Sequence, residues 1–164
     1  MARRSRPVDI IHEFLRAIWK LDHDLQRVSK RMEATVGLTG PQRLCLLHIG
    51  RQPRITPSRL ASVLHLDRGT ISGILSRLER SRLVTRVSNP DDRRSVHLTL
   101  TARGRAVNRN RIGSSEFAVR RALARVPARD IAIARRLLAR VSEQLHAIAS
   151  PRAGTRPASS RAKS

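Results

Sequence analysis

Residues 56–100 read TPSRLASVLHLDRGTISGILSRLERSRLVTRVSNPDDRRSVHLTL, and two kinds of periodicity follow one another in this segment. Up to about Ser81 the apolar residues recur every three or four positions, which predicts two short helices, 56–64 and 67–81, separated by a tight turn. Thr56 and Asp67 are of the type that caps a helix N-terminus. Two short stretches with the pattern of β-strands follow, 83–87 and 95–100. Together with the turn-rich segment between them they predict a β-hairpin.

The second predicted helix has an apolar side and a polar side. Its apolar stripe consists of Ile71, Ile74, Leu75 and Leu78. The opposite side presents small, hydroxyl-bearing or basic residues, namely Arg68, Gly69, Thr70, Ser72, Gly73, Ser76 and Arg77. The second helix of such a pair can lie in the major groove of DNA, where small side chains allow close approach to the bases. The alternative is an ordinary solvated helix face.

The predicted hairpin carries charge at its tip. Asp92, Arg93 and Arg94 lie in the connecting segment 88–94. An arginine there can enter a narrow minor groove beside the major groove that the helix occupies. We interpret Asp92 as a partner that orients one arginine through a charge-assisted hydrogen bond. A plain solvated turn is the alternative.

The net charge indicates a polyanionic partner. It is +22 over 164 residues, and the segment 51–111 alone holds 14 Arg against four acidic residues. Such a surplus favours nucleic acid or an anionic membrane surface. The basic residues are not confined to one face of an amphipathic helix, which disfavours the membrane. A codon bias can explain the preference for Arg over Lys, but it does not explain the net charge.

The remainder of the chain predicts further helices. Apolar residues at helical spacing indicate a long helix over 8–36 that Gly37 ends, a short helix over 41–50, and a last helix over 128–149. Between them we expect one helix over 102–125, weakened at Gly104 and Gly113. The basic arm 1–7 and the Ser-, Pro- and Ala-rich tail 150–164 have compositions typical of disorder. The sequence thus predicts a mainly α fold with one hairpin, in a single domain over 8–149.

Several motifs of this chain resemble the MarR-type winged-helix regulators. They are Leu66-Asp67-Arg68-Gly69-Thr70-Ile71-Ser72, the run from Arg77 to Arg86, Asn89-Pro90-Asp91-Asp92-Arg93-Arg94-Ser95 and Leu98-Thr99-Leu100-Thr101-Ala102-Arg103-Gly104. The resemblance implies a winged helix-turn-helix over 41–100, with dimerisation helices over 8–37 and 102–149. It places the Asp-x-Arg motif of the wing on Asp92 and Arg94, and it adds Arg86 to the DNA-contacting residues. Two positions depart from the family pattern: Ser81, where many relatives have Gly, and Gly73, where a larger polar residue is common.

The resemblance also implies a small effector. Family ligands, commonly aromatic acids, bind between the dimerisation helices and the DNA-reading part, where Trp19, His23 and His48 are candidates. Packing in the core or in a dimer is the alternative for Trp19. Cys45, the single cysteine, is either a redox sensor or a buried inert thiol, and its apolar surroundings favour the second. The six histidines show no metal-ligand spacing, and no catalytic motif is present, so we expect neither a metal, nor a cofactor, nor an enzyme.

The sequence therefore predicts a cytoplasmic, nucleoid-associated transcription regulator that binds double-stranded DNA as a homodimer. What the family resemblance adds is a repressor that binds a palindromic operator and responds to a small aromatic or anionic effector. The alternative is an architectural, nucleoid-type protein that binds DNA with little sequence preference. The operator, the regulated genes and the effector do not follow from the sequence.

Overall fold

The computed structural model describes residues 7–89, 92–110 and 113–149, and these fall into two compact units. The first unit extends to Arg120 and the second begins at Arg121. Residues 1–6 of the predicted basic arm and the whole of the predicted tail 150–164 lie outside the described residues. The division of the chain into domains therefore stays a prediction.

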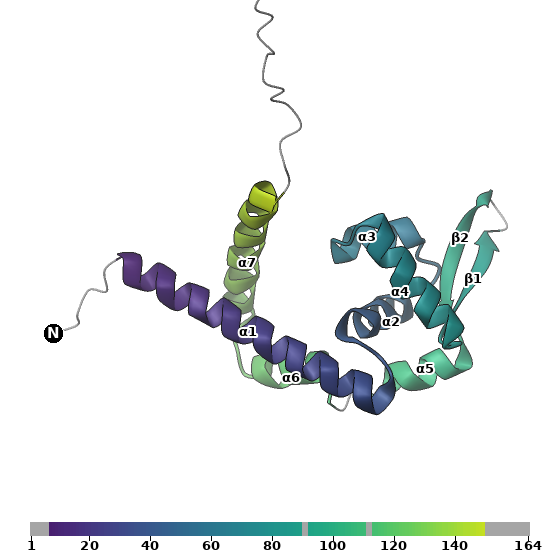
Figure 1. The fold of residues 1–164 in the computed structure, drawn as a ribbon, viewed down its shortest axis with the longest axis horizontal. Helices are drawn as coiled ribbons and strands as arrows, with labels where there is room; N and C mark the ends of the chain where they lie inside the picture. The colour runs from purple at the N-terminus through teal and green to yellow at the C-terminus, as the bar shows by residue number, and fades with distance from the viewer. Residues whose placement is uncertain (1–6, 90–91, 111–112, 150–164) are drawn as a thin grey trace, which may run out of the picture. The chain divides into compact units, whose positions relative to one another are not determined.

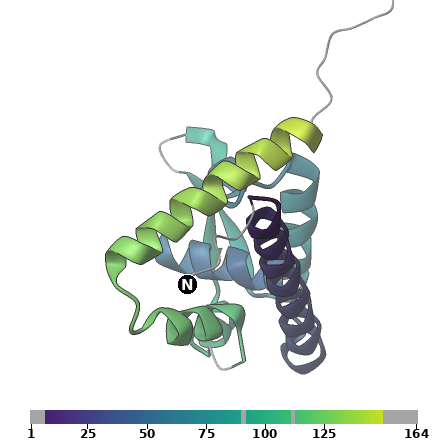
Figure 2. The same ribbon diagram turned by 90° about the vertical axis from the view of Figure 1, so that its left-hand side faces the viewer.

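The elements follow one another in a mainly helical order (Figure 1). They are α1 (Pro7–Val36), α2 (Gly40–Arg51), α3 (Pro57–Leu64), α4 (Arg68–Arg80), β1 (Val84–Asn89), β2 (Asp92–Leu100), α5 (Ala102–Arg109), α6 (Ser115–Leu123) and α7 (Ala128–Ala149). Figures 1 and 2 show α1 as one long helix without a break. The predicted fold class, helices with one antiparallel hairpin, is confirmed.

The helix boundaries lie where capping residues predict them. Gly37 ends α1 with a φ of 71°. Thr39 then begins α2 with a reciprocal pair of bonds: Gln42 N–H donates to Thr39 Oγ1, and Thr39 N–H donates to Gln42 Oε1 at 2.9 Å. Such a capping box satisfies two amide groups that have no partner inside the helix. Local sequence is therefore sufficient to place these ends.

Two expectations about element length were wrong. The hairpin strands extend to Asn89 and begin again at Asp92, so the connecting segment is shorter than the predicted 88–94. Antiparallel pairing continues past the predicted strand end to Ser88 opposite Val96, and a register shift follows at Asn89. The single helix expected over 102–125 is two helices, because α5 ends at Arg109 and α6 begins at Ser115, with Gly113 at a φ of 76° between them.

The hydrophobic core of the first unit lies between α2, α3, α4 and the hairpin. Its fully buried large side chains are Leu46, Ile49, Leu60, Leu75, Leu78, Leu98 and Cys45. Leu98 also joins the hairpin to the loop before α3, because its N–H donates to the carbonyl oxygen of Ile55 at 2.9 Å. The hairpin is thus anchored at its base to the helices that it follows.

The start of α5 packs against the two residues that precede β1. Thr101 caps α5 by accepting from Gly104 N–H at 2.9 Å, and its hydroxyl donates to the Arg82 carbonyl oxygen at 2.7 Å. An ideal Cβ on Gly104 would lie 1.9 Å from the carbonyl oxygen of Leu83. Glycine is therefore required by close backbone approach at this position, where the sequence suggested only a weak point of a helix.

A buried arginine connects α2 to α5 and α6. Arg43 is 3% exposed, and its guanidinium contacts Glu116 Oε1 at 2.6 Å. It also donates to the carbonyl oxygens of Val107 and Asn108 at 2.8 and 3.0 Å, in the last turn of α5. These donors satisfy carbonyls that the helix end leaves without partners.

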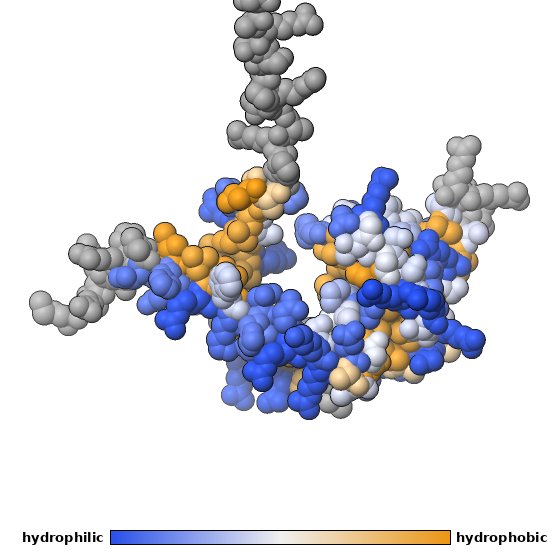
Figure 3. Space-filling model, in the orientation of Figure 1, coloured by the Kyte–Doolittle hydropathy of each residue, from blue (hydrophilic) through white to orange (hydrophobic). Residues whose placement is uncertain are grey.

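Large apolar side chains remain exposed on α1 and, in the second unit, on α7. They include Ile11, Leu15 and Trp19 on α1, and Leu138, Leu145 and Ile148 on α7. Figure 3 shows hydrophobic surface on both helices. No helix within the described ranges has an apolar stretch of membrane-spanning length.

Candidate nucleic-acid interface

The turn between α3 and α4 is short because one residue reverses the chain direction. His65 adopts a left-handed conformation, with φ 53° and ψ 40°, directly after α3. Leu66 N–H donates back to the Ala61 carbonyl oxygen at 2.9 Å, and Asp67 then begins α4. The two helices thus form the helix-turn-helix that the sequence predicts.

Helix α4 presents one side to the core and the other to solvent. The four predicted apolar residues, Ile71, Ile74, Leu75 and Leu78, are all buried. The predicted DNA-facing residues are all exposed: Arg68, Gly69, Thr70, Ser72, Gly73, Ser76 and Arg77. In Figure 3 the side of α4 toward the viewer carries mostly hydrophilic and neutral residues.

The first turn of α4 is held by a two-point contact between Asp67 and Thr70. Thr70 N–H donates to Asp67 Oδ1 at 2.8 Å, and the Thr70 hydroxyl contacts Asp67 Oδ2 at 2.6 Å. The hydroxyl bond, followed by the amide bond, lowers the pKa of the Asp67 carboxyl below its usual value. Asp67 is therefore a carboxylate at neutral pH, with both oxygens engaged by the same residue.

The other end of α4 turns sharply into the hairpin. Leu83 N–H donates to the Leu78 carbonyl oxygen at 2.9 Å, and Arg82 N–H donates to that of Glu79 at 2.8 Å. This is a Schellman motif, in which the residue after the cap takes a left-handed conformation. Here that residue is Arg82, with a φ of 56°, whereas Ser81 has a φ of −76°. The position that favours glycine in this turn is Arg82 and not Ser81.

The hairpin follows this turn, and an ion pair joins its first strand to α4. Arg86 on β1 donates from Nε to Glu79 Oε1 of α4 at 2.6 Å, and both side chains are partly exposed. Arg86 thus pairs with an acidic residue that the sequence analysis did not include in the site. The side chains of Asp92, Arg93 and Arg94 lie outside what the structure describes, so the roles predicted for them stay predictions.

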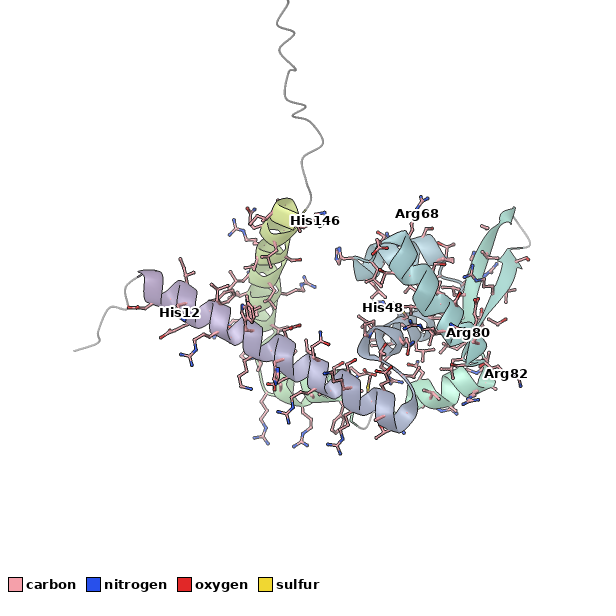
Figure 4. All side chains as sticks on the ribbon, in the orientation of Figure 1. His12, His48, Arg68, Arg80, Arg82 and His146 are labelled. Atoms are coloured by element: carbon pink, nitrogen blue, oxygen red, sulfur yellow. The ribbon has the colours of Figure 1, made fainter. Side chains whose placement is uncertain are left out.

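Basic side chains lie at both ends of α4. In Figure 4 Arg68 lies at the N-terminal end of α4 with its side chain extending outward from the protein. Arg80 and Arg82 lie at the opposite end of the helix. All three are exposed. Small and hydroxyl-bearing side chains flanked by arginines suit a helix that contacts bases through the small side chains and phosphates through the arginines.

The predicted effector residues are not gathered in one cavity. Trp19 is 75% exposed and lines a groove of about 830 Å³ whose lining residues include neither His23 nor His48. A second groove, of about 340 Å³, lies between α1, α2 and the α3–α4 turn and is lined by Leu25, Met32, Leu44, Leu64 and Leu66, among others. The effector residues therefore stay a prediction.

Cys45 is buried, and the described residues contain no cluster of His, Cys, Asp or Glu suited to a metal ion. Burial raises the pKa of the Cys45 thiol to about 12. A thiol in that state is protonated at neutral pH and is a poor nucleophile, which supports the interpretation as an inert core residue.

Comparison with known proteins agrees with this geometry. The family model described as MarR family matches residues 36–95, which include the helix-turn-helix and most of the hairpin. An HTH-type transcriptional repressor from Mycobacterium tuberculosis is 34% identical over 110 residues, which are 67% of this chain and 76% of that protein.

The chain belongs to the MarR family.

Further relatives support this membership over different lengths. The HTH-type transcriptional regulator TtmR from Methylorubrum extorquens is 32% identical over 104 residues, which are 63% of this chain but only 53% of that protein. The chain thus spans about half the length of this relative. A MarR variant from E. coli, solved in complex with operator DNA, has a TM-score of 0.63 at 26% identity, with 84% of this chain and 99% of that one covered.

The family-level expectations from the sequence are confirmed. The resemblance to the MarR family is correct, and the relatives are transcription regulators and not enzymes. Sequence reasoning missed Glu79 as the partner of Arg86 and missed the hydroxyl bond between Thr70 and Asp67. The spacing of three residues between Asp67 and Thr70 was a usable signal for the second, because an N-cap side chain reaches that far along the first turn.

Proposed function

We propose that this MarR-family chain is a sequence-specific repressor that binds a palindromic operator as a homodimer. Helix α4 of each protomer enters a major groove, and the hairpin reaches the adjacent minor groove. The observation that carries this proposal is the exposed side of α4, where small and hydroxyl side chains lie between basic ends. A two-fold dimer places two such helices about one helical turn apart on one face of the DNA.

The exposed apolar side chains of α1 and α7 support the homodimer. Leu145 and Ile148 are 58% and 82% exposed, and Trp19 is 75% exposed. Apolar residues at helical spacing that remain open to solvent are typical of helices that pack against a partner. A second copy of the chain supplies such a partner with matching helices.

Selection of bound DNA from a random pool, followed by competition, tests sequence specificity. A repressor of this kind prefers its selected palindrome over random DNA by about a thousandfold or more. An architectural protein shows affinities that vary with salt but hardly with sequence. Flat affinity across sequences would therefore exclude the repressor in favour of that alternative.

The contribution of the hairpin is tested with Arg94→Ala. If Arg94 enters the minor groove, the variant binds the selected site about tenfold more weakly, and the salt dependence of binding falls by about one ion. Arg103→Ala removes the same charge at an exposed position of α5 and serves as the control. Unchanged affinity in a folded Arg94→Ala dimer removes the hairpin tip from the mechanism.

We further propose that a small aromatic or anionic effector releases the DNA. The groove between α1, α2 and the α3–α4 turn supports this, because a ligand there contacts both α1 and the helix-turn-helix. Benzoate-type acids are the probes, and loss of operator binding on their addition is the expected result. Leu44→Trp, which fills the groove from a half-exposed position on α2, should abolish the response and keep DNA binding.

A further inference from the structure

The Asp67–Thr70 contact determines the direction of one hydroxyl group on the exposed side of α4. A threonine hydroxyl has one proton to donate and two lone pairs that accept. An ionised carboxylate can only accept, so the proton in the 2.6 Å contact comes from Thr70. An aspartate is ionised at neutral pH, and the bonds from Thr70 lower the pKa of Asp67 further.

Thr70 therefore presents only acceptor lone pairs to a ligand. A free serine or threonine rotates its hydroxyl to suit either a donor or an acceptor, and such residues serve any base or a phosphate. Thr70 has lost that freedom, whereas among the described residues no comparable partner holds the hydroxyls of Ser72 and Ser76. Phosphate oxygens are acceptors too, and the Asp67 carboxylate beside Thr70 repels them, so Thr70 is unsuited to a backbone contact.

In the major groove only exocyclic amino groups are donors. Adenine N6 and cytosine N4 carry them, whereas guanine presents N7 and O6 and thymine presents O4, all of which are acceptors. Every base pair presents one amino group in the major groove, and that group lies on one strand only. A fixed acceptor thus separates adenine or cytosine from guanine or thymine on the strand that it faces.

From this chemistry we infer that Thr70, held by Asp67, is a specificity-determining residue that requires an amino-bearing base, adenine or cytosine, at the position it contacts in each half-site. This inference rests on the proposed function, in which α4 lies in the major groove. Thr70 is well placed for it, because it is exposed in the first turn of α4, where recognition helices contact base edges.

Asp67→Asn provides a direct test because it reverses the hydrogen bond between the side chains of residues 67 and 70. Asparagine caps a helix as well as aspartate does, so its side-chain oxygen still accepts from Thr70 N–H. Its amide nitrogen then faces the Thr70 hydroxyl and donates to it, which frees the hydroxyl proton to point outward. The contacted position should lose its preference for adenine or cytosine and accept guanine or thymine. Removal of a negative charge strengthens binding to all DNA, so the ratio between bases is the quantity to measure.

The experiment selects operators from a random pool with the wild-type protein, with Asp67→Asn and with Thr70→Val, and then measures affinity for single-base variants of the selected site. Wild type should prefer adenine or cytosine at one symmetric position by about threefold to tenfold. Thr70→Val, of similar shape, should lose that preference, and Thr35→Val, the same change at an exposed position of α1 outside the predicted DNA-contacting residues, should keep it. Circular dichroism confirms that each variant is folded.

The outcomes separate this inference from the function on which it rests. If wild type selects a palindrome but Asp67→Asn and Thr70→Val leave every base preference unchanged, the assignment of Thr70 is wrong and the regulator stands. Guanine or thymine at the position that Thr70→Val affects overturns the assignment as well. If wild type selects no sequence at all, both the assignment and the proposed repressor fail.

Discussion

At the scale of single residues, Arg43 differs from the exposed arginines that surround it in the chain. It is almost fully buried, and its guanidinium satisfies one carboxylate and two backbone carbonyls. A charge in that position is tolerated because the guanidinium nitrogens donate to a carboxylate and to backbone carbonyls. The residue has a structural role, although its type and the net charge of the chain favour DNA contact.

Arg43→Met should therefore destabilise the protein strongly. The variant leaves Glu116 and two helix-end carbonyls without their donor, and loss of one partner of a buried pair costs about 3 to 5 kcal/mol. Arg103→Met, at an exposed position of α5, should change the free energy of unfolding by less than about 0.5 kcal/mol. Urea unfolding measures both. Equal stability of the two variants would contradict the role assigned to Arg43.

The Cys45 thiol should be unreactive in the native protein. Its pKa is raised to about 12 because burial disfavours the thiolate, so the thiol is protonated at pH 8. Between about pH 9 and pH 12 the native state keeps the thiol proton, whereas the unfolded chain releases it. The stability that the buried thiol contributes is therefore present below about pH 9 and declines as the pH rises toward 12. A thiol reagent at pH 8 should label the protein only after denaturation. Rapid labelling of the folded protein would show that Cys45 is accessible.

At the scale of elements, α4 and α5 use glycine for different reasons. Gly73 lies on the exposed side of α4, and a Cβ there meets nothing within 4 Å. Gly104 lies in the first turn of α5, where a Cβ would overlap the backbone of Leu83. The first glycine leaves the space in front of the exposed side of α4 open, and the second allows two elements of the protein to approach.

Alanine at these two positions should shift stability in opposite directions. Gly73→Ala should stabilise the protein by about 1 kcal/mol, because alanine favours a helix interior over glycine. Gly104→Ala should destabilise it by about 3 kcal/mol, since the overlap forces backbone shifts. Thermal or urea unfolding gives both values.

The same Gly73→Ala variant links stability to the proposed function. If the backbone at Gly73 lies against the bases, the added methyl group should weaken binding to the selected operator while the protein becomes more stable. Thr35→Ala, which also introduces alanine at an exposed helical position but lies on α1 outside the predicted DNA-contacting residues, serves as the control. Operator affinity that is unchanged in Gly73→Ala would show that no base approaches this position.

At the scale of the whole molecule, many of the exposed large apolar side chains among the described residues lie on α1 and α7. The N-terminal part of α1 and the whole of α7 have few buried side chains, although their apolar residues recur at helical spacing. A helix this amphipathic is stable only when its apolar side is covered. The proposed dimer supplies that cover.

A chain that ends at residue 127 should therefore lose self-association. Sedimentation measures the change from dimer to monomer, and the protein carrying both Leu138→Glu and Leu145→Glu tests the same surface within the full-length chain. Arg136→Glu, on the same helix at an exposed charged position, is the control and should stay dimeric. A truncated chain that remains a dimer would contradict the assignment of α7 to the interface.

Sequence alone was sufficient for what depends on neighbours a few residues apart. The ends of α1, α2, α3 and α4, the apolar stripe of α4 and the alternation that predicts the hairpin all rest on contacts within about four positions. The resemblance to the MarR family rested on the motifs within residues 66–104. Only the tertiary structure showed that Arg43 pairs with Glu116, that Gly104 touches Leu83, that Arg86 pairs with Glu79 and that the predicted helix over 102–125 divides in two. These features depend on groups that are distant in the sequence, or on competition between helix propensity and packing. A periodic pattern of apolar residues does not say which distant backbone group or charged side chain a residue will contact.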